Sequence, residues 1–310
     1  MAKVTFIITT FNNKDIIDEC LDSVKNQNYA DFNITVVDDC STDGTPEHIK
    51  KKYPNIKVIQ KQIQTGPSSS RNIGITNTKS DYVVFMDSDV VLNKMWVGQL
   101  VRFMGNNKEV GIVAGKLMFY DDKTKINSAG GGLFRMGVGF DIGRDYEQRD
   151  VLYVCSAAMM ARKKVLDEVG GFDDSYFYGY EDTDLGWRVN LAGYRVVYYP
   201  QALAYHKGSQ TVSSMPDRVY FHAVKNRIRT MLKNYETKNW IIYIPINILF
   251  TLGNVIRGHR VAQIKGILWN FTHIGSTLRE RKIVQQARKI KDKELFRLFH
   301  KLDFRLLLGG

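Results

Sequence analysis

The sequence predicts an α/β fold, in which a mostly parallel twisted sheet is flanked by helices and followed by a basic helical extension. Two observations lead to this prediction. Short apolar runs rich in β-branched residues alternate with segments of helical periodicity over about the first hundred residues, a pattern typical of βαβ units. Positive charge is then concentrated in residues 218–310, which contain 19 Lys and Arg but 5 Asp and Glu, whereas the whole 310-residue chain has a net charge of +12.

The first half supplies the elements of this sheet. The expected strands are residues 4–9, 32–37, 57–60 and 82–86. Helical spacing of apolar residues predicts helices at residues 14–26, 45–53 and 69–76. The first and last of these strands are apolar on both faces, so we expect them to be buried between two layers of helices. Polar residues close three of the strands, and ligands of such sheets bind beyond the carboxyl ends of the strands.

The middle of the chain, roughly residues 110–205, is less regular. A glycine-rich stretch at residues 130–143 shows no alternation and predicts an adaptable loop. Residues 165–169 and 182–191 favour helices, and residues 195–199 favour a strand that stops before Pro200. We expect one large domain plus an appendage, because 310 residues exceed what one hydrophobic core usually supports.

Composition excludes several classes of protein. With 44% hydrophobic residues, 25% charged residues and only 6 Pro, the chain is neither collagen-like nor wholly disordered. The cysteines Cys20, Cys40 and Cys155 are widely spaced, so a disulfide framework or a structural zinc site is not expected. The short apolar run after Lys3 is too brief for a signal peptide. These features favour a reducing, cytoplasmic environment.

The basic tail, residues 218–310, has the chemistry of a membrane-associating segment. Residues 240–256 carry no charge, but a spanning helix needs about 20 apolar residues and this stretch contains Pro245 and Asn247. We expect it to lie at the interface of an anionic membrane, with basic amphipathic helices around it. A true span and a basic helical subdomain packed on the body stay open as alternatives. Nucleic acid is not an expected partner, because basic and aromatic positions do not interleave as in known modules.

The segment Asp87-Ser88-Asp89 directly follows a hydrophobic strand and is the first candidate for chemistry. Two carboxylates at i and i+2 can point towards one place if the chain turns. Hard oxygen ligands of this kind hold Mg²⁺ or Mn²⁺, and a pyrophosphate supplies the remaining oxygens. A solvated turn is the alternative interpretation.

Asp38 and Asp39 close the second predicted strand and precede a turn. A carboxylate there can accept hydrogen bonds from a base N–H or a ribose hydroxyl. Turn chemistry alone explains the residues that follow, but explains Asp39 less well. The sequence has no GxxxxGK[ST] motif and no GxGxxG motif between a strand and a helix. Nucleotide binding would therefore depend on carboxylates and a metal.

Three acids, Glu181, Asp182 and Asp184, open a predicted helix, where the helix dipole favours negative charge. Simple N-terminal capping is one interpretation. The aromatic residues just before them would build a pocket wall, and a carboxylate among apolar groups holds its proton more tightly, which suits a general base. His206 follows the last predicted strand and is either structural or the completing ligand of an oxygen-rich metal site.

Taken in order, these segments resemble the inverting glycosyltransferases of the large GT-A family 2, including rhamnosyltransferase- and galactofuranosyltransferase-like members. The resemblance covers about residues 3–207. It rests on six stretches, VTFIITTFNN, VVDDCSTDGT, GPSSSRNIGI, DYVVFMDSDV, CSAAMMARKKVLDEVGGFD and YEDTDLGWRVNLAGYRVVYYPQALAYH. It implies a GT-A catalytic domain at residues 1–217, with a nucleotide-binding half at about 1–105 and an acceptor half at about 106–217. Residues 218–310 fall outside the shared part.

The resemblance also implies which residues bind the donor and the metal. The positions that match the nucleotide site are Thr9, Phe11, Asp39, Arg71, Asp87 and Ser88. Most relatives have Tyr where Phe11 stands, so a hydroxyl contact is lost while stacking survives. The positions that match ligands of Mn²⁺ or Mg²⁺ are Asp87, Asp89 and His206.

For the reaction, the resemblance implies a single in-line displacement at the anomeric carbon, with Asp182 as general base. Glu181, Trp187 and Arg188 match a helix start that faces the acceptor and the donor phosphates. The donor would be a nucleoside-diphosphate sugar of the UDP, dTDP or GDP type, and the acceptor a hydroxyl of a glycan or a lipid-linked molecule.

The chemistry of the basic tail, which lies outside the resemblance, suggests that it holds the enzyme on the cytoplasmic membrane as a peripheral protein. Self-association of the tail into a homo-oligomer is the alternative.

Two other functions stay open. A membrane-tethered, non-catalytic sugar-nucleotide-binding or scaffold protein would lack catalytic residues, yet Asp39, Asp87, Asp89, Asp182 and His206 are all present. A sugar nucleotidyltransferase would have a glycine-rich loop with Arg or Lys after the first strand, and residues 9–13 contain no glycine.

Overall fold

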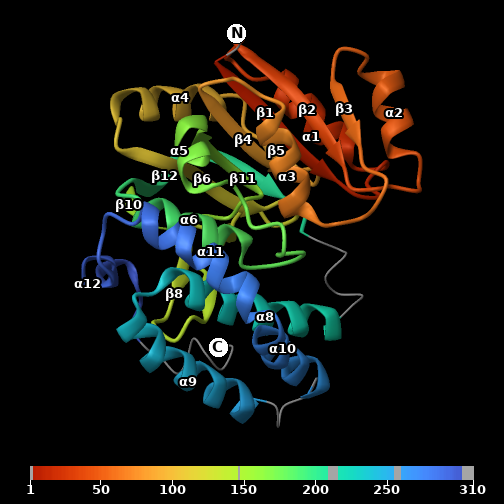
Figure 1. The fold of residues 1–310 in the computed structure, drawn as a ribbon. Coiled ribbons are helices and arrows are strands. Elements are labelled where there is room, and N and C mark those ends of the chain that lie inside the picture. The colour runs from red at the N-terminus through yellow and green to blue at the C-terminus, as the bar shows by residue number, and fades with distance from the viewer. Residues whose placement is uncertain (1–2, 146, 209–215, 255–259, 302–310) are drawn as a thin grey trace.

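A ten-stranded mixed sheet lies at the centre of the molecule, with strand order β10-β12-β6-β11-β4-β1-β2-β3, β5 paired to β12 and β7 paired to β6 (Figure 1). The computed structural model describes residues 3–145, 147–208, 216–254 and 260–301. The sheet and its helices place the polar ends of several strands at one edge, and the site is built there.

The N-terminal half of the sheet is parallel, as predicted. Its strands are β1 (Val4–Thr10), β2 (Phe32–Asp38), β3 (Lys57–Gln60) and β4 (Tyr82–Asp87). The connecting helices are α1 (Ile17–Lys25), α2 (Thr45–Lys52) and α3 (Pro67–Thr76). Every residue of β1 is buried, in agreement with its apolar character on both faces. The predicted strands and helices of this half are confirmed to within a few residues.

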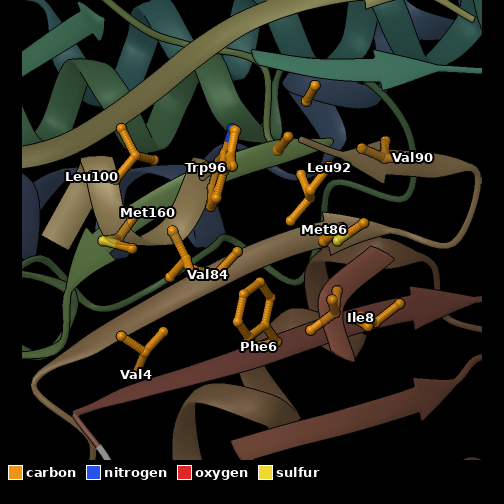
Figure 2. Close-up of a cluster of buried hydrophobic side chains, with 14 of the residues drawn as sticks. Val4, Phe6, Ile8, Val84, Met86, Val90, Leu92, Trp96, Leu100 and Met160 are labelled. Atoms are coloured by element: carbon orange, nitrogen blue, oxygen red, sulfur yellow. The ribbon is translucent and has the colours of Figure 1, made fainter. Parts of the chain in front are cut away.

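Alternate residues of β1 and β4 enter two separate cores on the two faces of the sheet. Phe6, Val84 and Met86 pack on one face against α1 and α4 (Trp96–Asn106), where Trp96 is fully buried (Figure 2). Ile7 and Phe85 point to the other face, where they meet residues of the helices that follow β11. Two-sided burial therefore fixes the register of the central strands, because a slip of one residue would exchange the two faces.

The second half of the sheet is mixed. Its strands are β5 (Val90–Leu92), β6 (Val110–Phe119), β7 (Ile126–Ser128), β10 (Arg149–Asp150), β11 (Ala158–Arg162) and β12 (Arg195–His206). Strand β11 runs antiparallel to both β4 and β6, whereas β12 runs parallel to β6. The helices of this half are α5 (Lys163–Val169) and α6 (Glu181–Leu191), which confirm the two helices predicted there.

Two details of this half differ from the sequence predictions. Strand β12 does not end before Pro200; its pairing with β6 shifts register between Tyr198 and Leu203 and then resumes, and such an irregularity is where a strand tolerates proline. The glycine-rich stretch is not a loop, since β8 (Gly131–Leu133) and β9 (Gly139–Asp141) form a small antiparallel sheet. A Cβ on Gly131 would lie 2.0 Å from the ring of Tyr153, so the glycine makes room for that ring.

The C-terminal residues form a group of helices that packs on the body. They are α8 (Pro216–Asn234), α9 (Thr237–Asn254), α10 (Arg260–Thr272), α11 (Ile274–Ala287), α12 (Asp292–Leu295) and a short 3₁₀ helix, η2 (Phe296–Leu298). In the described part of the chain no helix has the length and apolar character needed to cross a membrane. Most of the uncharged stretch 240–256 lies in α9, and its last two residues fall outside the described residues.

The tail and the body share a buried interface of apolar and charged groups. Trp187 of α6 packs edge-on against Tyr235 and Phe299 of the tail, with ring centroids 4.7 and 5.2 Å apart. Beside them, Lys233 of α8 contacts Asp184 of α6 at 3.1 Å.

Asp173, in the loop before α6, joins this charged group. Lys233 contacts Asp173 at 2.6 Å and Arg229 contacts it at 3.0 Å. Burial raises the pKa of Asp173, but the charges of Lys233 and Arg229 together hold it well below its usual range. This network ties α8 both to α6 and to the loop that precedes α6.

Replacing Lys233 by Met is expected to destabilise the fold by about 3–5 kcal/mol, because it leaves two buried carboxylates without a shared cation. Chemical denaturation monitored by circular dichroism measures the change. The matched control is Lys289→Met, which removes an exposed pair with Glu168 and should leave stability unchanged. Equal stability of the two variants would contradict the structural role of the buried network.

Candidate active site

Two strands and a turn bring the acids of the DSD segment together with His206. Asp87 is the last residue of β4, Asp89 lies in the turn before β5, and His206 is the last residue of β12. Because β5 pairs with the end of β12, with Val90 opposite His206, the imidazole lies beside the carboxylates. The ligand atoms of the three residues all lie within 4.8 Å of one another. The sequence prediction that these residues share a site agrees with this arrangement.

His206 is held in place by a hydrogen bond on each ring nitrogen. Its Nε2 lies 3.3 Å from Oδ2 of Asp89, and its Nδ1 lies 3.1 Å from Oδ1 of Asn127. Burial lowers the pKa of His206, but the hydrogen bond to Asp89 and the charges of Asp89, Asp87 and Asp141 raise it by more. The surroundings of the imidazole therefore carry excess negative charge, which favours a bound cation. Two carboxylates and an imidazole are a donor set that suits Mn²⁺ or Mg²⁺.

Arg71 of α3 connects this group with the start of α6. Its guanidinium donates to Oδ1 of Asp87 at 2.8 Å and to Oε1 of Glu181 at 3.3 Å, and its side chain is only 2% exposed. The guanidinium also lies 5.3 Å from the ring centre of Phe172. Nε of Arg71 and Oε2 of Glu181 are buried and have no hydrogen-bond partner among the described residues. Arg71 therefore binds two carboxylates of the protein, and its Nε is a donor that no described residue uses.

Polar residues at the end of β1 and just after it hold the turn of the DSD segment. Thr9 donates to Oδ1 of Asp87 at 3.1 Å. The amide of Asn13 donates at 2.7 Å to the hydroxyl of Ser88, which is buried. The predicted nucleotide residues Thr9 and Ser88 thus contact the turn that carries the predicted metal ligands.

Asp39 lies beyond β2 and anchors the loop between β3 and α3. Its carboxylate accepts hydrogen bonds from the backbone N–H groups of Thr65 and Gly66, at 3.1 and 2.9 Å, and from the ammonium of Lys61. Gly66 has φ of +90°, and a Cβ there would lie 2.7 Å from the carbonyl oxygen of Phe177, so the close approach requires glycine. Phe11, which was predicted to bind the nucleotide as Asp39 was, is half-buried just after β1.

Asp182 is half-buried in the first turn of α6 and has an unusual electrostatic environment. Its Oδ1 accepts a hydrogen bond from the backbone N–H of Thr183 at 2.7 Å. Burial, together with the charges of Glu181 and Asp141, raises the pKa of Asp182 to about 8, against smaller lowering effects of Thr183 and Arg71. A carboxyl group with such a pKa is suited to accept a proton near neutral pH.

The aromatic loop before α6 is fixed by the tail helix α8. Asn226 donates to the carbonyl oxygens of Tyr178 and Gly179 at 2.8 and 2.7 Å, and Lys225 donates to that of Ser175 at 2.6 Å. The predicted pocket wall is thus only partly available, because Tyr176 is fully buried, whereas Tyr178 is exposed. The residues that fix the loop before Asp182 come from the tail and are absent from the sequence prediction.

Asp141 is a further site residue that the sequence prediction missed. It ends β9, and its charge acts on both His206 and Asp182. Loss of hydration raises the pKa of Asp141, more than a hydrogen bond to Ser128 and the charge of His206 lower it. Asn127, the partner of His206, was also missed. Both residues lie on short strands with no clear alternation, and a lone Asp or Asn in such a segment gives no signal.

Trp187 and Arg188 do not lie with this group. Trp187 is buried between the body and the tail. Arg188 donates to Oδ2 of Asp184 at 2.8 Å and to the carbonyl oxygen of Val169 at 2.7 Å. Both side chains are buried, and these contacts hold α6 to the tail and to the end of α5.

Known proteins share both the sequence pattern and the fold. The chain is 36% identical over 121 residues to a poly(ribitol-phosphate) beta-glucosyltransferase of Bacillus spizizenii, which covers 37% of this chain and 19% of that protein. It is 28% identical over 207 residues to a pre-mycofactocin glycosyltransferase of Mycobacterium tuberculosis, which covers 66% of this chain and 42% of that protein. The chain thus spans less than half the length of these two relatives.

The GT-A fold is supported by a solved structure as well. A mannosyltransferase of Pyrobaculum calidifontis, in complex with GDP-Man and Mn²⁺, matches with a TM-score of 0.58 at 17% identity, covering 92% of this chain and 85% of that one. The sequence model of glycosyl transferase family 2 matches residues 5–170, which is more than half of the chain. This match contains β1 to β4, Arg71 and the DSD turn, and we conclude that the chain belongs to glycosyl transferase family 2.

Proposed function

We propose that this protein is a metal-dependent, inverting glycosyltransferase that moves a sugar from a nucleoside-diphosphate sugar to a hydroxyl group of a glycan or lipid-linked acceptor. The observation that carries the proposal is the pairing of two groups at one edge of the sheet. One is the cluster of Asp87, Asp89 and His206, whose ligand atoms lie close enough together to hold a cation. The other is Asp182, a carboxyl group with a raised pKa. Arg71 bridges the two through Asp87 and Glu181.

In this proposal Asp87, Asp89 and His206 hold the metal. A bound Mn²⁺ or Mg²⁺ offsets the negative charge of the diphosphate leaving group. The bound Mn²⁺ in the structurally similar mannosyltransferase supports a metal here. Asn127 fixes the orientation of the imidazole, since it holds the ring nitrogen that faces away from Asp89.

The donor would lie along the ends of β1, β2 and β4. Asp39 and Phe11 would contact the base, and Thr9, Ser88 and Arg71 would contact the ribose and diphosphate side. The GDP-Man in the mannosyltransferase structure supports a nucleoside-diphosphate sugar as donor, and the UDP, dTDP and GDP types are the candidates. Because Asp39 already holds the 61–66 loop through Lys61 and two backbone N–H groups, it would orient that loop as well as the base.

Asp182 would act as the general base. The acceptor oxygen forms a bond to the anomeric carbon while the bond from that carbon to the diphosphate oxygen breaks, with its electron pair leaving on the nucleoside diphosphate. The acceptor proton passes to the carboxylate of Asp182. A single displacement of this kind inverts the anomeric centre. Glu181 would keep Arg71 oriented towards Asp87, whereas the buried contacts of Arg188 favour a structural role for it over one at the phosphates.

Changing Asp182 to Asn is expected to preserve donor binding and to lower turnover by at least about a hundredfold, because the amide cannot accept the proton. Calorimetry with UDP, dTDP and GDP in the presence of Mn²⁺ measures binding. Release of nucleoside diphosphate from the corresponding sugar donors measures turnover, with water or a lipid extract as acceptor. The matched control is Asp121→Asn on the surface. Unchanged turnover in Asp182→Asn would contradict the role of Asp182 as general base, and donor binding without turnover in the wild-type protein would favour a non-catalytic, sugar-nucleotide-binding protein.

The rate of the wild-type protein is expected to rise with pH up to about 8 and then to level off, because only the deprotonated form of Asp182 can accept a proton. As the pH falls below that value, the carboxyl group is protonated and the rate drops. Initial rates at saturating donor between pH 6 and 9 give the profile. A flat profile would show that another group takes the proton.

Replacing Asp89 by Ala should abolish Mn²⁺-dependent binding of the nucleoside diphosphate, because a carboxylate ligand is lost beside His206. Calorimetry with and without Mn²⁺ makes the comparison. Asp31→Ala serves as control, because Asp31 is exposed and directly precedes β2, at the end of that strand opposite to the site. Equal binding with and without Mn²⁺ in the wild-type protein would contradict metal dependence.

A further inference from the structure

Helix α10 has its apolar residues on the outside of the molecule. Its exposed side chains include Val261, Ile264, Leu268 and Phe271, which recur at helical spacing along one face. Its buried face carries Gln263, Gly266 and Asn270 as well as Ala262 and Ile267. The amide of Asn270 donates to the carbonyl oxygen of Lys225 in α8 at 3.1 Å. A surface helix of a water-soluble domain has the opposite arrangement, with its polar side outward.

Helix α9 shows the same inversion. Its exposed side chains are Ile241, Ile242, Ile246, Leu249 and Leu252. Inside, the fully buried Asn247 donates to the carbonyl oxygen of Met136 at 2.6 Å, and the hydroxyl of Thr251 accepts from Arg227 at 2.6 Å. The inner face of α9 thus packs on the body through polar contacts and through the buried Ile244, whereas its exposed apolar side chains are not covered by any of the described residues.

These exposed apolar residues of α9 and α10 form what we call the outer apolar face. Figure 1 shows both helices at the end of the molecule opposite the N-terminus, packed on α8. Exposed apolar surface of this extent marks an interaction site. Because the inner sides of both helices are bonded to the body, the partner must contact them from one side only.

The charges around the outer apolar face select the kind of partner. The two helices that carry this face contain three basic residues, Lys238, Arg260 and Lys265, and no acid. Lys238 and Lys265 are exposed, and Lys265 lies directly beside Ile264 on the outward side of α10. A second copy of this chain would bring these cations against one another. A lipid surface with anionic headgroups offers both an apolar layer and the opposite charge.

We propose that the outer apolar face docks flat on a membrane that contains anionic lipid. The apolar side chains of α9 and α10 enter the boundary between headgroups and acyl chains, and the basic residues contact the lipid phosphates. Helix α8 connects the docked helices with the proposed active site, because Lys225 and Asn226 of α8 hold the loop before α6. The proposal concerns binding alone and does not require glycosyl transfer.

Flotation of the full chain with lipid vesicles tests the proposal. Vesicles of phosphatidylcholine with 30% phosphatidylglycerol are compared with vesicles of pure phosphatidylcholine, at low and high salt, where about 30% anionic lipid gives a clear negative surface potential. The variant Leu249→Glu/Phe271→Glu changes two side chains that are 69% and 65% exposed, so the fold should be kept. The control Met95→Glu changes an apolar side chain that is 44% exposed at the start of α4.

The wild-type protein and Met95→Glu are expected to float with the anionic vesicles, and the double variant to lose binding about tenfold or more. Pure phosphatidylcholine and high salt should weaken binding of the wild type. Thermal unfolding of each variant verifies that it is folded. The proposal is overturned if the wild type stays with the soluble fraction, or if the folded double variant floats equally well. A dimer that the double variant disperses, without vesicle binding by the wild type, would assign the face to a second copy.

Discussion

The buried guanidinium of Arg71 is the contact on which the site depends. The carboxyl edge of this sheet gathers acids from three separate elements, and like charges at such short range would repel one another. Arg71 lies between Asp87 at the end of β4 and Glu181 at the start of α6, and both carboxylates contact its nitrogens. Arg71 thereby links the first half of the chain, which carries Asp87, to the second half, which carries Glu181. Arg71 forms no ion pair with Asp89 or Asp182, to which we assign metal binding and proton transfer, whereas Asp87 contacts Arg71 and is also a proposed metal ligand.

The C-terminal helices are part of the same arrangement. Lys233 lies between Asp173 and Asp184, so one ammonium fixes both the loop before α6 and the helix itself. Asn226 then holds the backbone of that loop two and three residues before Glu181. The position of the proposed base is therefore set jointly by the sheet, through Arg71, and by α8. A tail that contributes such contacts takes part in forming the site and carries the outer apolar face on its far side.

Much of the fold could be predicted from sequence because its signals are local. The strands of the parallel half are short, apolar on both faces and rich in β-branched residues, and the structure has each of them within a residue of its predicted end. The carboxyl-edge rule then placed Asp39, Asp87 and Asp89 near one another without any coordinates. Prediction was weaker where glycine and proline carried the only signal, because the hairpin at Gly131 and the strand through Pro200 depend on partners elsewhere in the chain.

The sequence by itself determined the α/β class, the order of the elements, the acids at strand ends and the concentration of charge in the tail. Each of these depends on neighbours along the chain. Only the tertiary structure decided which charges meet, because contacts such as those of Arg71 with Glu181 and of Lys233 with Asp173 join residues far apart in sequence. The same holds for burial: helical spacing shows that α10 has an apolar face, but only packing on α8 turned that face outward.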